Sequence, residues 1–175
     1  MRNVLSLFGK RQREERPREE PGKQEALYER YWRLYERMDA LLDDDSESAW
    51  REMGKLRKER DRIDSLVVER NLAGKDLEKK GRVEAAIEKY EANVREGTDT
   101  PFPYRRLAII YEREKRYDDA LRVLNAQREM ILWMQSYWSK RGEKQRARDL
   151  EDSLADVRKR VARIKKKMQK TKGST

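Results

Sequence analysis

The chain has 175 residues, 45% of them charged and 36% apolar, and its formal net charge is +10 at pH 7. This balance leaves little for a large spherical core and favours an elongated helical structure in which each helix buries one stripe. Cys and His are both absent, which excludes disulfides and thiolate sites and removes the commonest general base and metal ligand. No apolar run is long enough to span a bilayer. Together with the absence of Cys and His, this favours a cytoplasmic protein, and we expect it to use no cofactor.

Residues 1–23 are expected to form a flexible N-terminal tether. They begin with a short apolar patch, which consists of Val4, Leu5, Leu7 and Phe8, and continue as a run of Arg, Glu, Gln and Pro. The patch is too short for the core of a signal peptide and lacks a cleavage site of small residues. We interpret it as a disordered start; the alternative is an amphipathic peptide that docks on a partner or touches a membrane surface.

Residues 24–66 are predicted to form a pair of helices. In the first helix, apolar residues recur at spacings of 4, 3, 4 and 3, which is typical of a helical stripe; they are Leu27, Tyr31, Leu34, Met38 and Leu41. The aromatic residues beside this stripe are expected to pack on the next helix rather than to stack on nucleic-acid bases. An acidic turn over residues 43–48 caps the second helix, which runs from about Ala49 towards Lys80.

Residues 67–126 repeat themselves at an interval of 34 residues. Four pairs of positions carry the repeat: Gly74 and Ala108, Leu77 and Tyr111, Ala86 and Ala120, and Tyr90 and Leu124. This interval and these residue types resemble the tetratricopeptide family. The resemblance covers roughly a third of the chain and implies two consecutive helical hairpins.

Each copy is predicted to contain two helices joined by a short turn. The first turn lies at residues 80–82, where Gly81 supplies the left-handed backbone that ends a helix. A helix over 83–95 follows, and the second copy consists of a helix over 104–114, a turn at 115–116 and a further helix. Because paired helices approach most closely where side chains are small, we expect Gly74 to face Ala86, and Ala108 to face Ala120.

Residues 127–170 are predicted to form a long capping helix or helices, followed by a disordered tail over 171–175. Nothing near Leu132 signals a stop, so the helix that starts at residue 117 or 118 is expected to continue towards Arg141. Apolar residues then recur at spacings of 4, 3, 4, 3 and 4, as in a heptad seam; they are Leu150, Leu154, Val157, Val161, Ile164 and Met168. The seam implies packing on the repeats or pairing with a second copy as a homodimer. A degenerate third repeat over 135–168 is the alternative to the cap, which we favour.

These elements predict an all-α fold, in which antiparallel hairpins of tetratricopeptide type form a short right-handed superhelical array between long N- and C-terminal helices. The resemblance implies a concave groove that binds an extended peptide or a partner helix. Carried over by register, its groove-facing residues are Asn71, Lys75, Glu78, Lys79, Arg105, Ile109, Glu112 and Arg113, with Arg106 beside them. The carboxylate clamp of some relatives is not supported, because Asn71 occupies a Lys place and Lys75 an Asn place. The groove is mildly basic and would prefer acidic peptides.

The C-terminal end is strongly basic, with nine Lys and Arg and no acidic residue from Val157 onward. Such a run suits the phosphates of a nucleic acid through counterion release, and it suits an anionic membrane or an acidic protein equally well. The candidate contacts are Arg158, Lys159, Arg160, Arg163, Lys165, Lys166 and Lys167.

Enzymatic activity is not expected, because the sequence has no Gly-rich phosphate loop, nucleophile elbow or zinc signature. The expected function is that of a non-catalytic adaptor or scaffold whose groove binds a peptide or helix of a protein partner. The alternative is a nucleic-acid-associated protein that contacts phosphates through the basic C-terminal helix.

Overall fold

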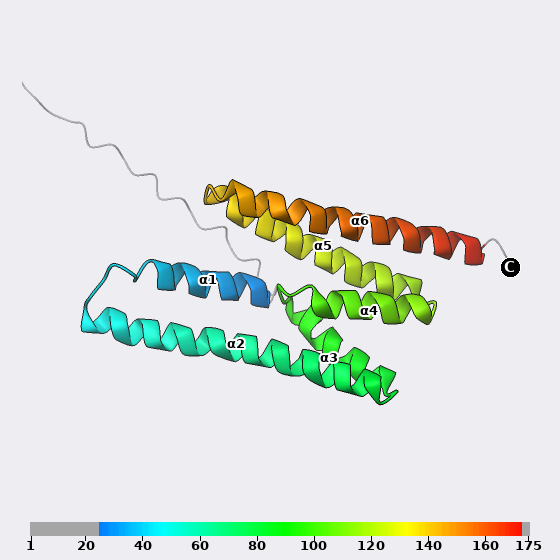
Figure 1. Cartoon of the computed structure of the whole chain (residues 1–175), viewed down its shortest axis with the longest axis horizontal. Coiled ribbons are helices and arrows are strands. Elements are labelled where there is room, and N and C mark those ends of the chain that lie inside the picture. Colours follow the sequence, from blue (N-terminus) through cyan, green and yellow to red (C-terminus); the bar gives the residue numbers. More distant parts are fainter. Residues whose placement is uncertain (1–24, 173–175) are drawn as a thin grey trace, which may run out of the picture.

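The computed structural model describes residues 25–172, and over this part the chain is entirely helical (Figure 1). Six helices follow one another: α1 (Leu27–Asp39), α2 (Glu47–Lys79), α3 (Val83–Glu96), α4 (Phe102–Arg113), α5 (Tyr117–Lys140) and α6 (Lys144–Lys172). Each helix packs on the next one in the chain. Among these helices, none combines the length and apolar character that crossing a membrane requires. The expected tether over 1–23 lies outside the described residues.

The helix predicted to run from about Ala49 towards Lys80 is confirmed as one continuous helix, α2. Ser46 caps its N-terminus, because the Ser46 side chain accepts a hydrogen bond from the Ala49 N–H at 3.2 Å. The acidic turn therefore acts as a cap, as predicted. The boundary placed between residues 66 and 67 falls inside α2, so the first hairpin shares its first helix with the N-terminal part of the chain.

The backbone of the two hairpin turns repeats at the interval of 34 residues. Gly81 and Lys115 both have a positive φ, of 71° and 60°. The next residues, Arg82 and Arg116, have φ and ψ of −88° and 65°, and of −81° and 64°. In each turn the N–H of this Arg donates to the carbonyl five residues earlier, at 2.9 and 2.8 Å. The repeat seen in the sequence is thus also a repeat of local conformation.

The main core lies where α3, α4 and α5 meet, and its largest fully buried side chains include Tyr90, Tyr104 and Tyr111. Tyr90 covers Gly74 of α2: a Cβ atom added at Gly74 would lie only 2.5 Å from Cε1 of the Tyr90 ring. The side chain nearest to Gly74 is therefore Tyr90, a contact that the expected approach of Gly74 to Ala86 did not include. A ring needs more room than a methyl group, which explains why this position holds Gly.

Helix α1 lies between α2 and the C-terminal part of α5. Its rings meet those of α5, with centroid distances of 5.0 Å for Tyr28 and Trp133 and 4.9 Å for Trp32 and Trp138. The expectation that the aromatic residues would pack on the next helix agrees with the position of Tyr31, which lines a small cavity with Ile63 and Val67 of α2. The ring contacts of Tyr28 and Trp32 with another helix are with α5 instead, within the described residues. On its other side, α1 is joined to α2 by ion pairs such as Arg37 with Glu52 at 2.6 Å.

The first turn of α1 rests on the end of α3. Gly97 ends α3 with a φ of 72°, and its carbonyl accepts a hydrogen bond from the Tyr28 N–H at 2.9 Å. A Cβ atom at Gly97 would lie 2.8 Å from Cβ of Ala26, so a larger residue would push α1 away. The connection between α3 and α4 therefore lies against the start of α1, and α1 extends away from it.

Helix α6 runs back along α5 and covers it (Figure 1). Its predicted seam faces the core: Leu154, Val157 and Ile164 are buried, and Leu150 and Val161 pack against the core cluster. The seam is thus covered within one chain, so it is not free to serve as the homodimer interface considered above. Helix α6 also continues to Lys172, two residues into the tail expected over 171–175, and the other residues of that range lie outside the described part of the chain.

Candidate binding surface

A cavity of about 390 Å³ lies between the start of α4 and the two helices α5 and α6. Helices α5 and α6 extend well beyond the start of α4 (Figure 1), so α4 covers only part of the surface that they form together. The wall of the cavity is mainly apolar and is formed by Met130, Ile131, Met134, Leu150 and Val157. Unbranched Met side chains adapt their shape easily, as is common in surfaces that receive another protein.

Both signs of charge surround this cavity. Arg105 and Arg160 line it together with Asp99, Asp152 and Asp156. Arg160 lies 3.6 Å from Asp156, whereas burial and the carboxylate of Asp64 raise the pKa of Asp99. The sequence predicted a mildly basic groove and missed these carboxylates, because Asp152 and Asp156 belong to α6, which the sequence analysis treated only as a basic segment.

The predicted groove residues have different surroundings in the structure. Arg105 lines the cavity, and Asn71 accepts a hydrogen bond from Nδ2 of the buried Asn93 at 3.0 Å. Asn71 is therefore held by the scaffold rather than free to bind a peptide terminus. Lys79 lies 3.7 Å from Asp76 on its own helix, an exposed pair that contributes little. The other predicted residues of this group, Lys75, Ile109 and Arg113, are exposed.

Glu78 and Glu112, which are 34 residues apart, each join two helices. Glu78 on α2 pairs with Arg106 on α4, and Glu112 on α4 pairs with Arg163 and Lys167 on α6, both at 2.7 Å. Each Glu side chain is only 13% exposed. These pairs connect α2 to α4 and α4 to α6, so Arg106, predicted to lie beside the groove, has a structural role.

The pKa values of both carboxyls reflect these pairs. Burial alone would raise the pKa of Glu78, but hydrogen bonds from Arg106 and Tyr90 lower it. The Tyr90 hydroxyl donates to Glu78 at 2.7 Å. At Glu112, burial is likewise outweighed by the hydrogen bonds from Lys167 and Arg163, which lower the pKa. Both carboxyls are therefore held in their charged form.

The basic run of α6 divides into paired and unpaired cations. Arg163 and Lys167 bind Glu112, and Arg160 lies beside Asp156. Four further cations on α6 are exposed and have no acidic partner within residues 25–172; they are Arg158, Lys159, Lys165 and Lys166. Only these four of the seven predicted polyanion contacts are available without breaking an ion pair.

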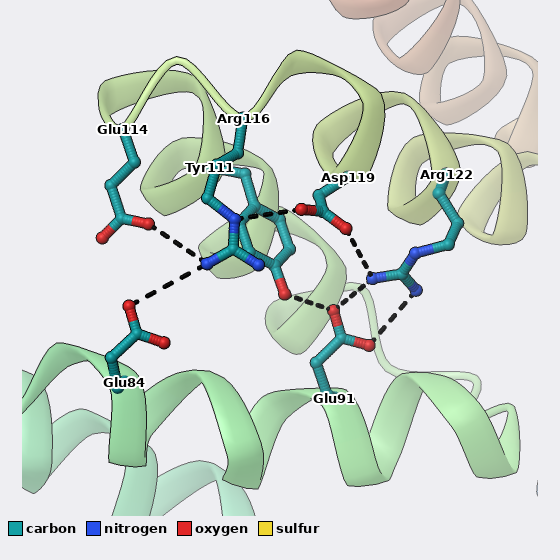
Figure 2. Close-up of polar contacts among 7 residues, drawn as sticks. All are labelled: Glu84, Glu91, Tyr111, Glu114, Arg116, Asp119 and Arg122. Atoms are coloured by element: carbon teal, nitrogen blue, oxygen red, sulfur yellow. Dashed lines mark hydrogen bonds and ion pairs between the residues drawn. The ribbon is translucent and has the colours of Figure 1, made fainter.

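A separate polar network joins α3 to the turn between α4 and α5. Figure 2 shows Tyr111 and Arg122 converging on Glu91: the Tyr111 hydroxyl donates to it at 2.6 Å and the Arg122 guanidinium at 2.5 Å. Arg116 lies over the Tyr111 ring, 4.3 Å from its centroid, and donates to Asp119 at 2.9 Å. The network joins side chains of α3, α4 and α5 through ion pairs and hydrogen bonds, so we interpret it as structural, and no pattern in the sequence indicated it.

A larger hollow, of about 1,100 Å³, lies where α1, α2 and the end of α3 meet. Its cations come from all three helices, and no local pattern in the sequence indicates that they converge; they are Arg30, Lys55, Lys58, Arg62 and Arg95. Arg30 is engaged by Glu59, whose carboxylate also lines the hollow. Most of the residues that line this hollow are charged, and Leu27, Ile63 and Leu66 form its apolar part.

No protein-family model matches this chain, and neither a curated protein nor a solved structure matches it significantly.

Proposed function

We propose that this protein is a non-catalytic binding module in which two tetratricopeptide-like repeats, formed by the C-terminal part of α2 and by α3 to α5, present a surface to a partner protein. Two observations support the repeat assignment: the turn conformation that recurs at Gly81 and Lys115, and the pairs that Glu78 and Glu112 each make with the helix two further along the chain. In this assignment α6 occupies the place of the first helix of a third repeat and serves as the cap.

The observation that carries the proposal is the cavity between α4, α5 and α6. Its volume of about 390 Å³ falls within the range of about 300–1,000 Å³ that ligand pockets occupy. Its apolar wall suits a large apolar side chain, and the charges around it suit a segment that carries both signs. An amphipathic helix or an extended peptide with one bulky apolar anchor meets these requirements.

The test fills the cavity from its rim without removing any core side chain. Ser153 is exposed on α6 and lines the cavity, so Ser153→Trp places an indole where the anchor would bind. Peptides of about twelve residues are selected from a phage-displayed random library on the wild-type chain. Ser153→Trp is expected to weaken their binding about tenfold or more, since a bulky anchor dominates such interfaces.

Ser136→Trp is the matched control, because Ser136 is exposed on α5 and does not line the cavity. This variant is expected to bind the selected peptides as the wild type does. A library that yields no binder, or binders that tolerate Ser153→Trp, would count against the proposal.

The four unpaired cations of α6 favour a second candidate function, which is contact with a polyanion such as a nucleic acid. Lys159 and Lys166 are seven residues apart, as are Arg158 and Lys165, so each pair lies on one face of the helix. Such contacts would be weakened by salt and insensitive to sequence, because phosphates carry no base information.

A further inference from the structure

Two exposed apolar residues of α2 occupy positions that are covered one repeat later. Val68 and Leu72 are 53% and 58% exposed. Their equivalents, 34 residues on, are Phe102 and Arg106 of α4. Phe102 is half-buried, with its ring 5.8 Å from the Tyr90 ring of α3, and Arg106 pairs with Glu78 of α2. Both equivalents thus face the preceding hairpin.

Helix α1 precedes α2 but does not cover this face. Its ion pairs to α2 join Arg30 to Glu59 and Arg37 to Glu52, which lie in the N-terminal part of α2. Only the start of α1 comes near, because Leu27 and Tyr28 line a small cavity together with Val68. Leu72 occupies the position that Arg106 holds in the next repeat, where Arg106 pairs with the carboxylate of Glu78. A segment that covers this face must therefore offer Leu72 an apolar contact and not a carboxylate.

We propose that the apolar patch at residues 4–8 of the same chain packs on Val68 and Leu72. Val4 and Phe8 are four residues apart, as are Val68 and Leu72, so on two helical turns each pair would share one face. The chain outside the structure joins α1 at Glu25, two residues before Leu27 in the cavity that Val68 lines. Residues 9–24 span up to about 50 Å when extended, which exceeds the reach required.

Charge supports the same occupant. Residues 1–13 contain four cations and no acidic residue. Along α2, Asp64 lies one turn before Val68, Glu69 directly follows Val68, and Asp76 lies one turn after Leu72. The cations nearest in sequence to Leu72 are Arg70, which pairs with Glu96, and Lys75. The N-terminal segment therefore brings an apolar group and positive charge to an apolar pair flanked by carboxylates.

The absence of Cys makes a direct test available in the full-length chain. Ser6 lies within the patch, and Ser65 is exposed on α2, one turn before Val68 and two before Leu72. The double variant Ser6→Cys, Ser65→Cys is expected to form an intramolecular disulfide under mild oxidation. Docking raises the effective concentration of the two thiols, so this disulfide forms about tenfold faster than in the control pair Ser6→Cys, Ser139→Cys. Ser139 is exposed on α5, away from this face.

Adding Leu72→Glu to the first pair is expected to reduce its rate to that of the control. Because Leu72 is exposed, the fold tolerates this change, and circular dichroism verifies that it does. Equal rates for the two cysteine pairs would overturn the proposal. So would disulfide-linked dimers in place of cross-linked monomers, because they would show that a second copy covers the face.

Discussion

The Tyr90 ring of α3 lies directly over Gly74 of α2, with no room for even one added carbon between them. In the second repeat the equivalent positions hold Ala108 and Leu124. In the first repeat the large Tyr90 is thus combined with Gly74, which has no side chain. In the second repeat the smaller Leu124 is combined with the larger Ala108. Each hairpin fills the same space with a different division of volume.

Gly74→Ala is expected to destabilise the protein. The substitution improves helix propensity by about 1 kcal/mol, but overpacking against a buried ring costs about 1–3 kcal/mol or more. We therefore expect a net loss of up to about 2 kcal/mol in the free energy of unfolding, measured in urea. Combining it with Tyr90→Leu, the pairing of the second repeat, is expected to recover at least about 1 kcal/mol as a coupling energy.

Gly54→Ala is the control for this prediction. Gly54 also lies inside α2, but an added Cβ atom there would meet nothing within 4 Å. This substitution is expected to stabilise the protein by about 1 kcal/mol through helix propensity alone. The contact with Tyr90 would be refuted if Gly74→Ala stabilised the chain to the same extent.

Lys115→Gly is expected to stabilise the protein by about 0.5–1 kcal/mol. Lys115 has a φ of 60°, whereas the equivalent turn residue of the first repeat is Gly81 with a φ of 71°. The left-handed backbone costs a residue with a Cβ atom about 1–2 kcal/mol, part of which is offset because Gly loses more entropy on folding. The reciprocal change, Gly81→Lys, is expected to destabilise, and thermal melts of both variants test the pair; shifts of the same sign would contradict the prediction.

The periodic part of the chain was the part that the sequence could predict. The interval of 34 residues located α3 and α4, and the missing stop signal near Leu132 predicted that α5 would continue to the end of its 24 residues. Local signals such as turn glycines and apolar spacing depend on neighbouring residues, so they can be read without knowing the tertiary structure.

Contacts between distant parts of the chain were not predictable in the same way. The spacing of the aromatic residues in α1 predicted a buried stripe. The rings of Tyr28 and Trp32 contact α5, however, and no local sequence pattern identifies a contact with a helix so far along the chain. The cavity depends on the different lengths of α4 and α6, and its carboxylates come from α6 and the loop before α4. Charge counts by segment could not show that cations of α6 would bind Glu112 of α4.

Glu112→Gln is expected to reduce the loss of stability in acid. Lys167 and Arg163 lower the folded-state pKa of Glu112 below that of the unfolded chain. The stabilisation is therefore complete above the unfolded pKa of about 4.3 and is lost as the pH falls through the folded value. Melting temperatures of wild type and variant are measured between pH 7 and pH 3, and their difference should narrow as the pH falls.

Asp99→Asn serves as the control with the opposite sign. Burial and Asp64 raise the pKa of Asp99 in the folded state above its value in the unfolded chain. The charged carboxylate therefore destabilises the fold at neutral pH, and this destabilisation is lost when Asp99 is protonated as the pH falls. The variant should be more stable than wild type at pH 7 and lose this advantage in acid. If both variants shifted the melting temperature in the same direction at pH 7, the assigned roles of these carboxyls would be wrong.

The two classes of cation on α6 are expected to behave differently on substitution. Replacing Arg158, Lys159, Lys165 and Lys166 by Gln should leave the melting temperature nearly unchanged, because these side chains are exposed and have no acidic partner in the described part of the chain. If α6 binds a polyanion, the plot of the logarithm of the oligonucleotide binding constant against the logarithm of salt concentration should become less steep in this variant, by about 3–4 in slope.

Replacing Arg163 and Lys167 by Gln gives the contrasting result. These residues neutralise the nearly buried Glu112, so their loss should lower the melting temperature. Fluorescence anisotropy with a labelled oligonucleotide at several salt concentrations reports binding for both variants. A salt slope that stays unchanged in the fourfold variant would remove α6 as a nucleic-acid contact.

The position of α1 has a consequence for how this chain unfolds. In linear repeat arrays each unit touches only its neighbours, so the ends fray independently of the middle. Here α1 joins α2 through Arg37 and Glu52 and reaches α5 through Tyr28 and Trp133. Opening either end of the array therefore requires breaking contacts with the other. Hydrogen exchange should accordingly report one cooperative unit, with the amides of α2 and α5 opening together.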